Sequence, residues 1–113
     1  MKPLEASSEP TDDELIDRLK AGDRTAGDVI VKRHHRLVAQ AVYHVIQDLA
    51  TVEDLMQDIF VKAFRKIHLF NRELGKFTVW LVTVSRHEAI NHLRRGKRSR
   101  HVSLDDADPE GGF

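Results

Sequence analysis

The sequence has no cysteine, few aromatic side chains and no long apolar run, and each absence excludes a class of protein. Without cysteine, neither a disulfide framework nor a thiolate metal site can form. No apolar stretch reaches the roughly 18 residues that a membrane-spanning helix requires. The first residues, MKPLEASSEPTDDE, lack the apolar segment of a secretory signal. We therefore expect a cytoplasmic chain, and its 113 residues suffice for one domain with a modest core.

The patterns that enzymes use are also missing. The sequence has no glycine-rich phosphate loop, and Ser85 has no convincing pattern of base and orienting group around it. His87 and His92 are five positions apart, whereas the zinc metalloprotease motif has two histidines four apart. His34 and His35 are adjacent and so point to different faces of a helix. The sequence therefore predicts no enzyme, no cofactor and no metal site.

Charge sums to zero over the chain but is unevenly distributed along it. Residues 1–61 hold seven basic and twelve acidic side chains, and residues 101–113 hold four acidic ones. Residues 62–100 hold eleven basic and two acidic side chains, a net charge of +9, interleaved with aromatic and amide side chains. Such a segment is typical of a surface that binds a polyanion, although a basic stretch can also be a solvated face. The aromatic and amide side chains favour nucleic acid, since exposed bases need flat partners.

Hydrophobic periodicity predicts an all-α fold, a compact bundle of about four helices. Thr11 and Glu14 have the spacing of a capping box that begins a short helix, and Gly22 suits its end. The further helices are expected at 24–47 with Asp23 as its cap, from Thr51 to Ile67, and from Thr78 as a cap to Arg95. Gly27 weakens the expected start of the second helix. The valines near Thr83 also suit a short buried strand, but the length of the segment favours a helix.

The predicted helix from Thr51 has one continuous apolar stripe. Its large apolar side chains recur at alternating intervals of three and four residues, which places them on one face. The opposite face carries Glu53, Asp54, Gln57 and Asp58. Flanking the helical region, residues 1–10 are expected to be flexible and residues 101–113 to be linker-like.

Two segments resemble the region 2 domain of bacterial extracytoplasmic-function (ECF) sigma factors. The first is EDLMQDIFVKAF, residues 53–64, and the second is FNRELGKFTVWLVTVSRHEAINHLRR, residues 70–95. The resemblance extends from about Thr11 to Leu104. It implies a region 2 helical domain at 11–100, followed at 101–113 by the start of an interdomain linker. The helix-turn-helix domain that follows in this family is absent from this sequence.

The resemblance implies a promoter-recognition domain that binds core RNA polymerase and recognises and helps melt the −10 promoter element. By matching position, Glu53, Asp54, Gln57 and Asp58 would contact the clamp helices of the polymerase β′ subunit. The loop at 68–76 and the helix after it would capture the non-template strand. The DNA-binding candidates are Asn71, Arg72, Lys76, Trp80, Arg86, His87, Asn91, Arg94, Arg95, Lys97 and Arg98. Four of these, the basic residues Arg94, Arg95, Lys97 and Arg98, would contact phosphates rather than specify sequence.

The sequence leaves several alternatives open. Trp80 is equally a candidate for the core. Primary sigma factors carry a tryptophan pair in the melting helix, and Thr83 and Val84 stand at the matching positions here. Melting would then depend more on capture of a flipped base. An anti-sigma factor is a further partner that the resemblance suggests. A stand-alone helical DNA-binding regulator and a protein-interaction module are the rival functions.

Overall fold

The computed structural model describes residues 9–101, with side chains as far as residue 96, and its regular elements in that range are all helical. They are α2 (Asp12–Lys20), α3 (Arg24–Ile46), α4 (Leu49–Arg65), the short 3-10 helix η1 (Ile67–Leu69) and α5 (Phe77–His101). This confirms the predicted all-α fold of about four helices. The predictions for the two ends of the chain lie almost wholly outside the described residues. None of the described helices is both long and apolar enough to cross a membrane.

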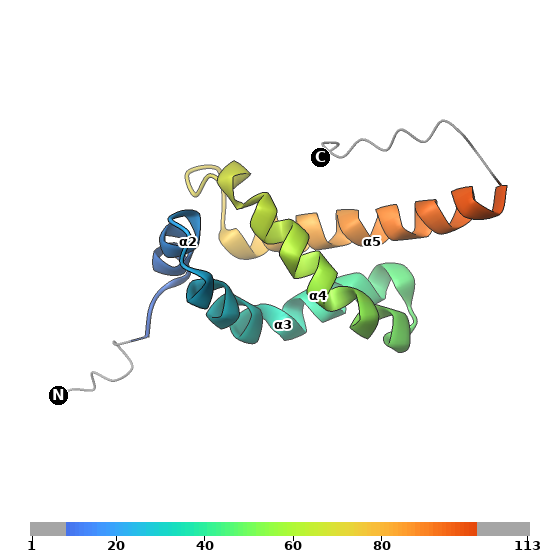
Figure 1. Cartoon of the computed structure of the whole chain (residues 1–113), viewed down its shortest axis with the longest axis horizontal. Coiled ribbons are helices and arrows are strands. Elements are labelled where there is room, and N and C mark those ends of the chain that lie inside the picture. The colour runs from blue at the N-terminus through green and yellow to red at the C-terminus, as the bar shows by residue number, and fades with distance from the viewer. Residues whose placement is uncertain (1–8, 102–113) are drawn as a thin grey trace.

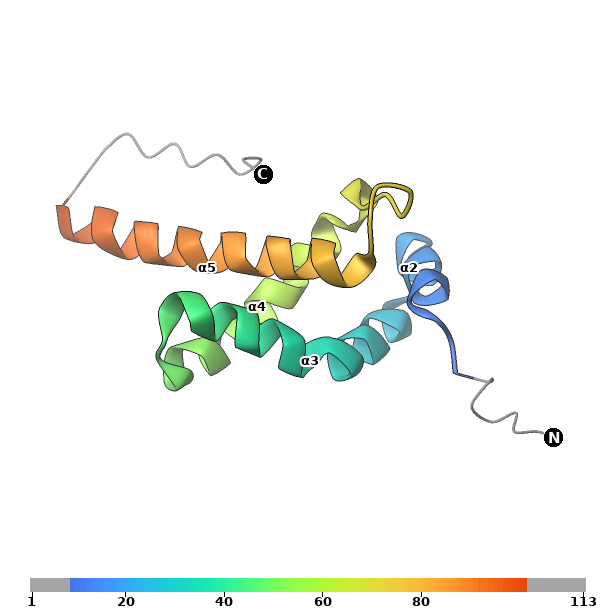
Figure 2. The ribbon, with the colours of Figure 1, turned by 180° about the vertical axis from the view of Figure 1, so that it is seen from behind.

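Helix α3 is the centre of the arrangement, since α2, α4 and α5 all pack against it. In Figure 1, α4 crosses in front of α3 and α5, and α2 lies at the end where α3 begins. Seen from behind in Figure 2, α3 and α5 run alongside each other with α4 beyond them. The loop that joins η1 to α5 therefore lies beside α2, although the two are about fifty residues apart in sequence.

The core draws large apolar side chains from all four helices. The predicted stripe of α4 is confirmed, because Val52, Met56, Ile59, Phe60 and Ala63 are buried. Burying a large apolar side chain stabilises the fold by roughly 1.5–3 kcal/mol before the loss of chain entropy is counted. The inner face of α4 is therefore fixed, and its outer face is left for solvent or a partner.

The predicted caps around α2 are present. The Thr11 hydroxyl accepts from the Glu14 backbone N–H at 3.1 Å, and the Thr11 N–H donates to the Glu14 carboxylate at 3.0 Å. Gly22 follows α2 with a φ of 100°, a left-handed conformation that glycine adopts without strain. Asp23 caps α3 by accepting from the Thr25 N–H at 3.0 Å. Hydrogen bonds, foremost the one from the Thr25 side chain, hold the pKa of Asp23 below its ordinary value.

The third helix begins and ends earlier than the sequence predicted. It begins at Leu49 rather than Thr51, with Asp48 at the N-cap position. The Asp48 carboxylate makes no cap bond to the backbone and accepts instead from the Thr51 hydroxyl at 2.6 Å. It ends at Arg65 rather than Ile67, which belongs to the 3-10 turn η1.

The last helix is longer than predicted at both ends. The Lys76 carbonyl already accepts from the Trp80 N–H at 3.1 Å, so Thr78 lies inside the helix and is not its cap. The helix continues past Arg95 and through Gly96 to His101. The alternative of a buried strand near Thr83 is excluded by this continuous helix.

Gly27 belongs to α3 despite the weak helix preference of glycine. A Cβ at this position would lie 3.1 Å from Cε2 of Phe64 in α4. Glycine thus lets the Phe64 ring approach the α3 backbone closely, and this packing outweighs the roughly 1 kcal/mol that glycine costs in a helix.

Candidate functional surfaces

The outer face of α4 presents the four polar side chains that the sequence placed there. Glu53, Asp54, Gln57 and Asp58 are all exposed. Asp58 pairs with Lys62 one turn further on, with 3.6 Å between Oδ2 and Nζ. Within the described part of the chain, the other three form no hydrogen bond or ion pair through their side chains. This face is therefore open to a partner, while the opposite face is fixed in the core.

A groove of about 630 Å³ runs beside this face, between α3 and α4. Its lining includes the apolar side chains of Val31, Met56, Phe60, Val61 and Phe64, together with the polar Asp28, Lys32, His35, Glu53 and Gln57. Apolar surface bordered by charge suits the apolar face of an amphipathic helix. The α4 face thus offers shape and apolar contact as well as charge.

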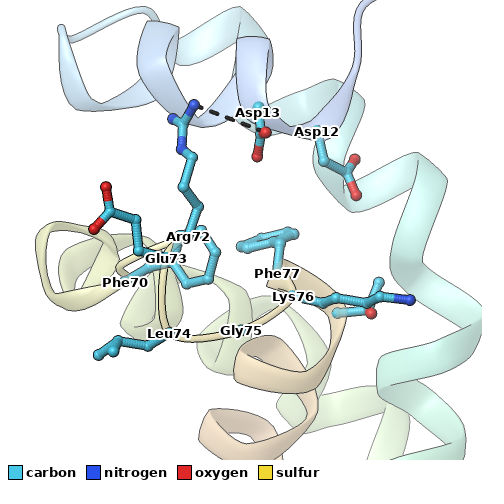
Figure 3. A pocket seen from close by; sticks show the side chains of 10 residues that line it. Asp12, Asp13, Phe70, Arg72, Glu73, Leu74, Gly75, Lys76 and Phe77 are labelled. Atoms are coloured by element: carbon cyan, nitrogen blue, oxygen red, sulfur yellow. Dashed lines mark ion pairs between the residues drawn. The ribbon is translucent and has the colours of Figure 1, made fainter.

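The loop between η1 and α5 separates two hollows. The larger, of about 700 Å³, lies between this loop and the start of α2, and Figure 3 shows the side chains around it. Its lining includes Asp12, Asp13 and Glu73. The smaller, of about 210 Å³, is lined by Leu69, Phe70, Asn71, Leu74, Gly75, Lys76, Val79 and Trp80. The first hollow therefore carries carboxylates, whereas the second combines apolar side chains with an amide and a lysine.

The aromatic rings of Phe70 and Trp80 line the smaller hollow, and Phe77 packs against both. The Phe70 and Trp80 rings lie 5.7 Å apart, and Phe77 stacks on Trp80 at 5.9 Å between centroids. Phe70 and Phe77 are buried, but Trp80 is only half-buried. Trp80 therefore packs partly against the core and partly lines the hollow, and its contact with DNA stays a prediction.

Helix α2 holds the loop by polar contacts. The Lys20 ammonium donates to the Phe70 carbonyl at 3.3 Å. The Arg72 guanidinium lies 2.6 Å from Asp17 and 3.7 Å from Asp13, and Figure 3 shows its reach toward α2. These contacts fix the position of Arg72 and of the start of the loop.

Two further hydrogen bonds turn the loop back on itself. The Asn71 side-chain oxygen accepts from the Glu73 N–H at 2.9 Å, and its carbonyl accepts from the Leu74 N–H at 2.9 Å. Asn71 therefore shapes the loop through its side-chain oxygen and its backbone carbonyl, and it lines the smaller hollow as well. Lys76, at the other end of the loop, is exposed and borders both hollows.

The DNA-binding candidates on α5 do not all share one environment. Arg86, Arg94 and Arg95 are exposed, and His87 is half-buried. Asn91 is only 4% exposed, on the inner side of the helix, so in this conformation it cannot contact DNA as the sequence predicted. Periodicity could have shown this, because Asn91 lies seven residues after Val84 and on the same helix face. The predicted contacts of Lys97 and Arg98 concern side chains outside the described ones.

The positions that match the tryptophan pair of primary sigma factors also differ from each other. Thr83 is exposed, and its hydroxyl donates to the Val79 carbonyl at 2.9 Å. Val84 is fully buried in the core. Neither side chain can act as an aromatic wedge, and Val84 does not face the surface at all.

Sequence reasoning missed several charged residues that organise these surfaces. Glu88 is 6% exposed, and its carboxylate lies 3.4 Å from the Lys62 ammonium and 3.2 Å from that of Lys66. The partners of Arg72 on α2 were missed as well, because a separation of more than fifty residues leaves no local signal. Among the described residues, no group of three His, Asp or Glu side chains could hold a metal ion.

Comparison with known proteins assigns this arrangement to a class. The sigma-70 region 2 family matches residues 30–99, more than half of the chain. The chain therefore belongs to the sigma-70 region 2 family, as the sequence motifs predicted. Within that family its relatives are ECF sigma factors, including the sigma-E factor of Escherichia coli K12, which is 30% identical over 105 residues.

The other relatives agree. The chain is 29% identical over 100 residues to the sigma-H factor of Pseudomonas aeruginosa, and 28% over 93 residues to the ECF sigma factor BldN of Streptomyces coelicolor. The alignments cover 92%, 86% and 82% of this chain for sigma-E, sigma-H and BldN. They cover 54%, 51% and 35% of those relatives, so the chain spans about half the length of the first two.

A solved structure resembles the fold closely. It is the NMR structure of an engineered region 2 of sigmaE in complex with GTAAAA. The two share 30% sequence identity and a TM-score of 0.72, over 81% of this chain and 95% of that one. The similarity therefore extends to almost the whole of the region 2 domain.

Proposed function

We propose that this domain recognises the −10 promoter element as an opened single strand, for a bacterial RNA polymerase in the cytoplasm. The observation that carries the proposal is the close likeness to a region 2 domain whose structure was determined with GTAAAA. The smaller hollow supports it, since its aromatic and apolar lining suits a base and Lys76 at its rim suits a phosphate. The domain carries out no chemistry of its own in this role.

The arginines along α5 extend this surface away from the loop. Arg86, Arg94 and Arg95 are exposed on a helix that continues beyond the other elements (Figure 1). Exposed guanidinium groups on this helix suit phosphates, and such contacts position a strand without reading its sequence. Base recognition would then be concentrated at the loop and at Trp80.

The outer face of α4 is the proposed polymerase contact. Its exposed side chains, Glu53, Asp54, Gln57 and Asp58, border an apolar groove, and the β′ clamp helices are the proposed occupant. The two faces belong to different helices, so one domain could hold polymerase and DNA together. An anti-sigma factor would be expected to cover one or both of them.

The DNA-binding function can be tested by fluorescence anisotropy with single-stranded GTAAAA and with the matching duplex. We expect the single strand to bind more tightly, whereas a stand-alone regulator that reads duplex grooves would show the reverse. Trp80→Leu should weaken binding about 5- to 140-fold, since one stacked base contributes about 1–3 kcal/mol. The affinity should fall by about 0.7 log units per log unit of salt for each phosphate neutralised. An affinity independent of salt would exclude nucleic acid as the ligand.

The polymerase-binding function has its own test, capture of the isolated β′ clamp helices. The wild-type domain should retain them, and the double variant Gln57→Ala, Asp58→Arg should not. Lys76→Ala is the matched control, because it changes a charged residue of the other surface and should leave capture unchanged. Failure of the wild-type domain to bind the clamp helices would refute this part of the proposal.

A further inference from the structure

Arg72, a candidate contact for DNA, is engaged by acidic side chains of its own domain. Its Nη2 lies 2.6 Å from Asp17 Oδ1, and its Nη1 lies 3.7 Å from Asp13 Oδ2. The two aspartates are four residues apart on α2, so they lie on one face of the helix and reach the same guanidinium. Arg72 therefore already has two carboxylate partners in the isolated domain.

These carboxylates also give the two sides of the loop different charge. Asp12 and Asp13 line the larger hollow on the α2 side together with Glu73, as Figure 3 shows. The lining of the smaller hollow contains Lys76 and no carboxylate. A phosphate thus meets three carboxylates and two cations, Arg72 and Lys76, on the α2 side, but one cation and no carboxylate on the other side of the same loop.

From this geometry we infer that Asp13 and Asp17 are specificity-determining residues, which occupy Arg72 so that a phosphate can reach it only by displacing them. The inference rests on the proposed function. A cation on an exposed loop binds any nucleic acid, because phosphate contacts carry no sequence information. Internal carboxylates lower this general affinity. Discrimination increases if the correct strand is held by a base in the smaller hollow and depends less on Arg72, because only strands that depend on Arg72 then lose affinity.

The expected effect is modest. The side chains of Arg72, Asp13 and Asp17 are about half exposed, and exposed ion pairs contribute little. Neutralising one aspartate should therefore tighten binding of an unrelated single strand by about two- to fivefold. Neutralising both should give a larger gain. The gain should be smaller for a strand held mainly by base contacts.

The test compares Asp13→Asn and Asp17→Asn with Glu14→Gln. Glu14 lies between them on α2, is exposed, and binds the Thr11 N–H rather than Arg72. All three changes alter net charge equally, and glutamine can keep the capping contact. Anisotropy with length-matched oligothymidine should show tighter binding by both asparagine variants than by the Glu14→Gln control. Equal gains in all three would overturn the inference, because they would reflect net charge alone.

The Arg72→Gln background separates displacement from general repulsion. There the gain from Asp13→Asn and Asp17→Asn should fall to that of the Glu14→Gln control. A gain that persists without Arg72 would overturn the inference. Weaker binding by the asparagine variants would overturn it too, since it would mean that α2 orients Arg72 for DNA. Urea unfolding of each variant ensures that only folded protein is compared.

Wild-type binding distinguishes this inference from the proposed function. If the wild-type domain binds neither GTAAAA nor oligothymidine, the proposed function fails and this inference fails with it. If the wild-type domain binds both and the asparagine variants match their control, the inference alone is wrong.

Discussion

Helices α4 and α5 carry the two proposed surfaces, but they divide polar and apolar side chains in different ways. Helix α4 buries apolar residues and exposes mainly polar ones. Helix α5 buries the polar Ser85, Glu88 and Asn91 alongside its apolar core residues, and it exposes Val79, Ile90 and Leu93. One helix separates its faces by polarity, and the other mixes both kinds on both faces.

The difference matches what each surface is proposed to bind. A protein partner can use the charged outer face of α4 together with the apolar groove beside it. A single DNA strand presents flat bases and phosphates at once, so a surface that combines apolar side chains with arginines suits it better. On the inner side, two of the buried polar side chains of α5 have partners. The Ser85 hydroxyl donates to the Leu81 carbonyl at 2.7 Å, and Glu88 pairs with α4.

The largest expected effect comes from breaking the inner face of α4. Ile59 is 2% exposed and its side chain belongs to the core cluster shared by all four helices. Ile59→Ala should lower the free energy of unfolding by about 2–5 kcal/mol, through lost burial and the cavity left behind. Urea unfolding followed by circular dichroism measures it. Gln57→Ala, on the outer face of the same helix, should change stability by less than about 0.5 kcal/mol. Similar losses for both variants would contradict the division of α4 into two faces.

A smaller effect is expected from the buried carboxylate of α5. Glu88→Ala leaves the ammonium groups of Lys62 and Lys66 without this partner, in a site that α5 covers. We expect a loss of about 1–3 kcal/mol, below that of Ile59→Ala because the lysine side chains can turn toward solvent. Glu88→Gln keeps the volume and one acceptor, so it should cost less than alanine. If Glu88→Gln lowers stability as much as Glu88→Ala does, the charge of Glu88 rather than its packing stabilises the contact between α4 and α5.

The difference between α4 and α5 explains why the sequence predicted the buried face of one helix better than that of the other. Amphipathic periodicity predicted the buried stripe of α4 and its exposed face correctly, because one interaction, apolar burial, decides that pattern. It predicted α5 less well, since Glu88 and Asn91 are buried although charged and amide side chains are mostly exposed in proteins. Capping residues predicted α2 through Thr11 but not the start of α5, where the Lys76 carbonyl accepts the first bond.

The candidate site shows a second limit. Local motifs identified the loop and its cations, including Arg72 and Lys76, from residues that are close in sequence. They could not show that Asp13 and Asp17 would reach Arg72, because tertiary packing alone brings α2 beside the loop. Contacts between distant segments thus decide which of the candidate cations is already paired within the domain.

The smallest expected effect concerns Asn91, and its sign is the informative part. The Asn91 side chain is 4% exposed, and its Oδ1 has no hydrogen-bond partner among the described residues. A buried acceptor without a partner destabilises a fold, so Asn91→Leu, of similar size, should leave stability unchanged or raise it by about 1 kcal/mol. Affinity for GTAAAA should stay within about twofold, because the side chain does not reach the surface. Urea unfolding and anisotropy measure the two. A stability gain accompanied by a large loss of affinity would mean that Asn91 turns outward when DNA binds. Its burial in the free domain would then be a stability cost that is kept because the side chain contacts DNA.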